Sequence, residues 1–229
     1  FIIGQFEGVA STTAVSIGSQ VMHMLTVMIV GLAMGTTVSI GQAVGAGDRR
    51  RAAQDVGNTV TLFMALSLVL TAALLLLVHP IVAIMSTPAE AVEGAVRYLT
   101  ICFIGIPFIT AYNIISSVFR GLGDSKSPMY FIAVACAANI ALDIFFIGPM
   151  ALGPVGAALG TTLSQTLSVI VALFGIRRHK TGLRLSRQNF RPRKGVLGRI
   201  LKIGLPVAVQ DGCIQVAFII ITIIANHRG

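Results

Sequence analysis

Charged residues are scarce in this sequence. Of its 229 residues, 11% are Asp, Glu, Lys or Arg, whereas a soluble domain carries about 25%. Hydrophobic residues account for 55% of the chain, and the mean hydropathy is +0.88. This composition excludes an ordinary soluble domain and predicts an integral membrane protein, in which the bilayer replaces water as the surrounding solvent.

Signatures of enzymes and of bound metals are also missing. No HExxH, GxSxG or P-loop pattern occurs, and the four histidines are scattered: His23, His79, His179 and His227. The three cysteines lie in apolar runs without metal-ligand or redox spacing: Cys102, Cys136 and Cys213. We therefore expect no catalytic residues and no cofactor. No basic segment precedes Phe1, so no signal peptide is predicted, and the opening of the chain resembles a cut through a longer element.

Acidic residues are fewer than basic ones, and the formal net charge is +9. In a soluble protein this excess would suggest nucleic acid as a partner. Here the basic residues flank apolar stretches, so we expect contact with the membrane surface and no nucleic-acid partner.

Six apolar stretches are long enough to cross a hydrocarbon core of about 30 Å: 9–46, 56–85, 95–119, 129–147, 155–176 and 200–225. The first contains no charged residue and carries Gly31 and Gly35, a spacing that permits close helix contact. The third is expected to break near Gly105 and Pro107, because proline removes a helical hydrogen bond. Segment 47–55, with its three arginines, is interpreted as a loop.

The basic residues divide unequally between the two sides of these spans. All Lys and Arg residues except Arg97 and Arg228 fall beside 47–55, beside 120–128 or near the long segment that follows the fifth span. Basic loops stay in the cytoplasm. We therefore predict a multi-pass protein of the cell (inner) membrane with these loops inside the cell. The long basic segment is interpreted as a topology determinant that contacts lipid headgroups.

One apolar span contains an ionisable residue near its middle. Asn139 and Asp143, four residues apart, lie on the same face of the helix predicted over 129–147. A charge at that depth costs roughly 2.5–3.5 kcal/mol, so it normally faces a partner or a water-filled cavity. The pair could also hold helices together, but an intramembrane carboxylate favours a functional role.

Five motifs resemble the multidrug and toxic compound extrusion (MATE) transporters, in the order and spacing of that family: GQAVGAGD, FRGLGDSKSPM, NIALDIFFIG, GPVGAALGTTLSQ and KIGLPVAVQ. The resemblance implies an all-α polytopic bundle that corresponds to family helices two to seven. Residues 1–178 would form an N-terminal lobe with the end of helix one, 179–199 a basic cytoplasmic connector, and 200–229 the first helix of a C-terminal lobe. The acidic residue that many prokaryotic members carry on helix one is not present in this sequence.

The resemblance also implies a cation site. By motif and spacing, its ligands are Asp143, Asn139, Asn113 and Thr161. Tyr98 is placed in the lining of the lobe, and Gln210 and Asp211 in the last span are candidates for the substrate cavity. Carboxylate, amide and hydroxyl oxygens suit a hard cation such as Na⁺, and a carboxylate removed from water can instead carry a proton.

The expected function is therefore antiport: entry of Na⁺ or H⁺ drives export of organic, often cationic, compounds. One alternative is a flippase of the same superfamily for lipid-linked saccharides, although such proteins generally carry more basic residues inside their cavity than these spans do. Another is a non-transporting membrane fragment that associates with the missing remainder of a transporter. Membrane lipids and small organic molecules are the expected partners.

Overall fold

The computed structural model describes residues 2–178 and 183–227. These residues contain helices and no β-strand. In chain order the elements are α1 (Ile2–Phe6), α2 (Val9–Gly45), α3 (Arg49–Ile84), α4 (Ala89–Ile104), α5 (Ile106–Gly121), α6 (Lys126–Ile147), α7 (Gly153–Arg178), the 3₁₀ turn η1 (Arg187–Phe190) and α8 (Lys194–His227). The predicted all-α bundle is confirmed.

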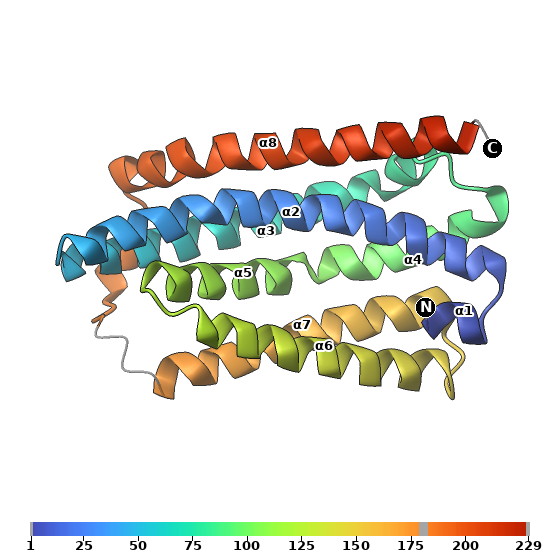
Figure 1. Ribbon diagram of the computed structural model, residues 1–229, viewed down its shortest axis with the longest axis horizontal. Helices are drawn as coiled ribbons and strands as arrows, with labels where there is room; N and C mark the ends of the chain where they lie inside the picture. Colours follow the sequence, from blue (N-terminus) through green and yellow to red (C-terminus); the bar gives the residue numbers. More distant parts are fainter. Residues whose placement is uncertain (1, 179–182, 228–229) are drawn as a thin grey trace.

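The long helices run side by side, and their connections gather at two ends (Figure 1). The α2–α3 turn, the α5–α6 turn and the segment before α8 lie at one end, which we call the basic end because it carries the arginines of 49–51 and 184–199. Helix α8 packs along α2 on one side of the bundle, and the α6–α7 pair lies on the opposite side. Helices α4 and α5 lie between them, so the two sides are separate environments.

Five helices are long and apolar enough to cross a membrane, and α4 with α5 makes a sixth span that bends by 47°. The bend confirms the predicted break. Gly105 ends α4, and Pro107 occupies the first turn of α5, where a missing N–H costs no hydrogen bond. A Cβ at Gly105 would lie 2.9 Å from the Thr162 methyl carbon of α7, so the bend is also a point of close approach.

The interpretation of 47–55 as a loop is wrong. The Asp48 carboxylate accepts a hydrogen bond of 2.9 Å from the Arg51 backbone N–H and caps α3, which therefore begins at Arg49. Helix α8 similarly begins at Lys194, inside the range predicted as connector. Of the basic residues used for the orientation argument, Lys180 and Arg228 lie outside the described residues.

Small residues bring α2 and α8 into close contact, as predicted for Gly31 and Gly35. A Cβ at Gly35 would overlap the backbone carbonyl of Ile200, and one at Gly204 would overlap that of Leu32. Neither clash could be relieved by a side-chain rotation, because both involve backbone atoms. The first span and the last are therefore held together at van der Waals distance without bulky side chains between them.

Candidate cation and substrate site

Asn139 and Asp143 lie on the same face of α6, as the sequence predicts. The Asn139 amide donates a 3.5 Å hydrogen bond to the Asp143 carboxylate, and both side chains are half-buried. Helix α6 is oriented at its first turn by Asp124, whose carboxylate accepts hydrogen bonds from the backbone N–H groups of Lys126 and Ser127. The carboxylate of Asp143 thus sits in the C-terminal half of a 22-residue apolar helix.

Helix α7 leaves space for this carboxylate. A Cβ at Gly160 would overlap the Asp143 carboxylate oxygen Oδ1, so any larger residue at position 160 would displace it. One turn earlier, Gly156 lies against Phe146 in the same way, with a Cβ distance of 3.1 Å. Gly160 thus leaves the space that Asp143 occupies, and Gly156 lets α7 approach α6 one turn away.

Tyr98 connects this side of the bundle to α2. Its ring, 5% exposed, covers Gly18, where a Cβ would overlap it. Its hydroxyl shares a 3.2 Å hydrogen bond with that of Ser19. Tyr98 is thus a buried phenol packed against α2, and its role in lining the lobe stays a prediction.

Asn113 and Thr161 use their donors within their own helices. The Asn113 amide donates to the Ile109 carbonyl oxygen at 2.8 Å, and the Thr161 hydroxyl donates to the Ala157 carbonyl oxygen at 3.0 Å. Among the described residues neither forms a hydrogen bond with Asp143. Their oxygen atoms remain available as acceptors, so their place in the cation site stays a prediction.

The other two candidates lie on α8, beside α2. The Asp211 carboxylate packs where α2 has Gly31, at 3.0 Å from the position of an added Cβ, and Gln210 is exposed. Nearby, α2 and α8 enclose a groove of about 420 Å³. Its lining is Ser16, Ser19, Gln20, His23, Gln215, Phe218 and Ile219. Ser19 belongs both to this groove and to the hydrogen bond with Tyr98 of the central helix α4.

A second buried acidic group was not singled out in the sequence. Asp55 is 0% exposed, and its carboxylate accepts hydrogen bonds from Ser39 at 2.7 Å and from the Arg199 guanidinium at 2.9 Å. It was counted with the loop, yet the capping Asp48 places it almost two turns inside α3, on the face shared with Ala52 and Thr59. Recognition of Asp48 as the N-cap of α3 would have placed Asp55 inside the helix.

Comparison with known proteins agrees with this arrangement. Residues 1–145 match the MatE family. The chain is 33% identical over 228 residues to the probable multidrug resistance protein YpnP of Bacillus subtilis, which covers 99% of the chain and 51% of that protein. It is 24% identical over 231 residues to the multidrug export protein MepA of Staphylococcus aureus, covering 100% of the chain and 51% of that protein.

Solved structures show the same fold. The inward-facing conformation of a multidrug resistance MATE family transporter of the MOP superfamily superposes with a TM-score of 0.88 at 26% identity, over 95% of this chain and 50% of that one. An outward-facing conformation superposes with a TM-score of 0.84 at 27% identity, over 92% and 47%. The chain spans about half the length of the curated relatives it matches.

Proposed function

The chain belongs to the MATE family, and from that premise we propose that it forms one lobe of a transporter that exports organic compounds in exchange for Na⁺ or H⁺. Relatives at this similarity are multidrug resistance and export proteins. The chain contributes the helices that would form one wall of the transport path. The observation that carries the coupling to a cation is the environment of Asp143.

Asp143 is a carboxylate in a membrane-length helix without a basic partner. In the described part of the chain, the ion pairs are Arg97–Glu93 and Arg199–Asp55, and no Lys or Arg side chain lies within ion-pair distance of Asp143. Gly160 leaves room beside it, and Asn139 supplies an amide. A carboxylate in this position is stabilised when it takes up a metal cation or a proton. The predicted ligands Asn139, Asn113 and Thr161 would supply amide and hydroxyl oxygens, which suit Na⁺.

The substrate surface in this proposal is the groove between α2 and α8. Its polar residues come from the first half of α2 and face Gln215, whose amide nitrogen is 3.4 Å from the His23 ring. Phe218 adds an aromatic face, which suits an organic cation. Asp211 on α8 would add negative charge close to the crossing with α2.

The two parts are coupled through Tyr98. Binding of a cation beside Asp143 alters how α6 packs on α7, and α7 packs on α4, whose Tyr98 is hydrogen-bonded to Ser19 in the groove wall. A cation entering on the α6 side would therefore bias the packing of α2 and release a compound held in the groove. In this proposal the basic end lies in the cytoplasm, in accord with the excess of arginines there.

The test replaces Asp143 by Asn in the complete gene product and measures export of the organic cation ethidium from cells or vesicles with an imposed Na⁺ or H⁺ gradient. Asp143→Asn keeps the side-chain size and removes the charge. We expect cation-driven export to fall to background while the amount of protein in the membrane is unchanged. Export that remains gradient-driven in this variant would refute the role of Asp143.

A matched control removes another carboxylate outside the proposed path. Glu93 is exposed and pairs with Arg97 one turn further along α4, so Glu93→Gln should leave gradient-driven export unchanged. Comparison of Na⁺ and H⁺ gradients on the unaltered protein then identifies the coupling ion.

A further inference from the structure

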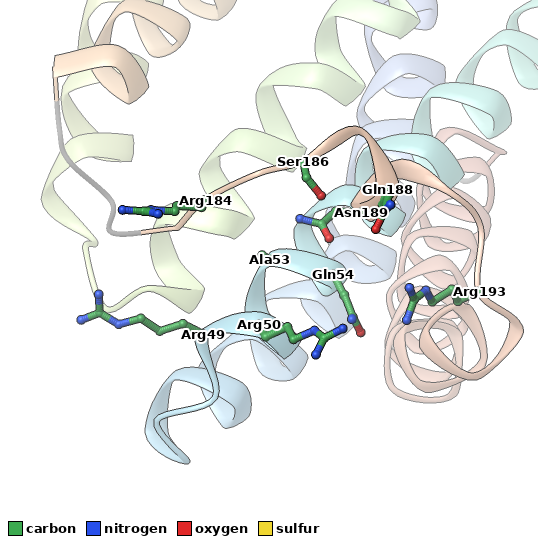
Figure 2. A pocket seen from close by; sticks show the side chains of 9 residues that line it. All are labelled: Arg49, Arg50, Ala53, Gln54, Arg184, Ser186, Gln188, Asn189 and Arg193. Carbon is green, nitrogen blue, oxygen red and sulfur yellow. The ribbon is translucent and has the colours of Figure 1, made fainter.

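A pocket of about 480 Å³ opens at the basic end, between α3 and the segment that leads into α8. Two arginines of the first turn of α3, Arg49 and Arg50, contribute to its lining, as do Arg184 and Arg193, more than a hundred residues further along the chain. The remaining lining residues are uncharged: Ala53, Gln54, Ser186, Gln188 and Asn189. Figure 2 shows the guanidinium groups of Arg50 and Arg193 turned toward each other, with the Gln54 amide between them.

The far wall of this pocket is fixed to α3 by hydrogen bonds. Asn58 donates to the Asn189 carbonyl oxygen at 3.1 Å and accepts from the Arg193 backbone N–H at 2.7 Å, and Thr61 donates to the Phe190 carbonyl oxygen at 2.7 Å. Gly57 permits this contact, because a Cβ there would overlap the Asn189 carbonyl. The backbone of 189–193 is therefore fixed against α3, and Arg193 is held beside Arg50, which distinguishes the pocket from a solvated basic tail.

Among the described residues, no carboxylate forms an ion pair with the arginines that line this pocket. Asp48 points its carboxylate at the backbone of α3, and Asp55 is buried against Arg199. A second pocket of about 500 Å³ shares Gln54 and Arg193 with the first and includes Arg51, whose Nε is buried without a hydrogen-bond partner in the described residues. Several guanidinium groups of like charge are thus brought together with unused donors, an arrangement that an anion stabilises.

We propose that this pocket binds a phosphate group, presented either by an anionic phospholipid headgroup or by a soluble phosphate ester. Guanidinium groups match phosphate oxygens in a planar, two-pronged geometry, and the positive end of α3 adds to the attraction. The volume accommodates a glycerophosphate-sized group. A phosphate bound between Arg50 and Arg193 would join α3 to the start of α8 and hold the basic end closed. This proposal does not depend on the coupling role of Asp143.

The experiment uses the complete gene product and measures its thermal unfolding midpoint in two settings. In one, nanodiscs of phosphatidylcholine are compared with nanodiscs that also contain phosphatidylglycerol. In the other, the detergent-solubilised protein is titrated with inorganic phosphate and with glycerol 3-phosphate. The test variant is Arg50→Gln with Arg193→Gln. The matched control, Arg187→Gln with Arg191→Gln, removes the same charge from exposed residues of the connector that do not line the pocket.

We expect a saturable rise in the midpoint for the unaltered protein and the control, and at least about tenfold weaker binding for the pocket variant. Each shift is measured against the same variant without ligand, so a change in basal stability does not affect the comparison. A rise with phosphatidylglycerol alone assigns the phosphate to a lipid, and a rise with soluble phosphate assigns it to a small ester; both support the site. Equal responses of the pocket variant and the control, or no response to either source, would overturn it.

Discussion

Of the three aspartates inside the described membrane-length helices, Asp55 and Asp143 have opposite surroundings. Asp55 on α3 is fully buried, and its two carboxylate oxygens are paired with Ser39 and Arg199. Asp143 on α6 is half-buried, and its hydrogen bond to Asn139 is long, at 3.5 Å. Within the part of the chain that the structure describes, Asp55 has an arginine partner, whereas no Lys or Arg lies within ion-pair distance of Asp143.

This difference is the reason for proposing a structural role for Asp55 and cation exchange for Asp143. A buried carboxylate paired with Arg can stay charged without help from outside, and here it joins α2 and α3 to α8 at the basic end. A carboxylate in apolar surroundings without such a partner must obtain a cation or a proton from solution. An aspartate can therefore hold helices together at position 55 and, in the proposed function, bind an exchangeable cation at position 143.

The largest effect should come from removing the partner of Asp55. Arg199→Met leaves a buried negative charge unpaired, which typically costs about 3–5 kcal/mol. We expect the lower end of that range, because the Arg199 side chain is 35% exposed. The measurement is thermal unfolding in detergent, followed by a thiol-reactive dye that reports exposure of the buried Cys102; the exposed Cys136 and Cys213 are first replaced by Ser.

The double variant Asp55→Asn with Arg199→Met provides the check on this prediction. Because both charges are removed together, it should recover much of the stability that Arg199→Met loses. If instead the double variant is as unstable as the sum of the single ones, Asp55 and Arg199 do not act as a pair, and the contrast with Asp143 fails.

The sequence contained enough to predict the spans and Asp143 but not the pairing of Asp55. Apolar runs gave six spans because the bilayer sets their length, and the Gly105–Pro107 break follows from the missing N–H of proline. Asn139 and Asp143 share a face by helical spacing alone. Arg199, however, is 144 residues from its partner, and no local pattern indicates which arginine will be buried. Side-chain hydrogen bonds such as that of Thr161 to Ala157 also depend on rotamers that sequence does not determine.

A substitution on α7 tests the part of this comparison that concerns Asp143. Gly160→Ala places a methyl group where the Asp143 carboxylate lies, and the carboxylate must move from its place beside α7. We expect gradient-driven ethidium export to fall about tenfold or more, with overpacking lowering stability by about 1–3 kcal/mol. In the matched variant Gly41→Ala the new methyl group would lie 3.6 Å from the Gly121 carbonyl, an ordinary contact, and export should be retained. Equal losses in both variants would mean that the space beside Asp143 has no special role.

The smallest effect is expected from loss of the hydrogen bond between Tyr98 of α4 and Ser19 of α2. Tyr98→Phe keeps the ring over Gly18 and removes the hydroxyl that bonds Ser19. A single neutral hydrogen bond contributes about 0.5–1.5 kcal/mol, so the unfolding midpoint should change little. If the phenol carries the coupling, gradient-driven export should fall severalfold, while binding of ethidium to the detergent-solubilised protein stays nearly the same. Ser19→Ala removes the other half of the same bond and should reproduce the loss, and the double variant should lose no more than either single one. Additive losses would show that Tyr98 and Ser19 act separately, and the route from Asp143 to the groove would then need another residue.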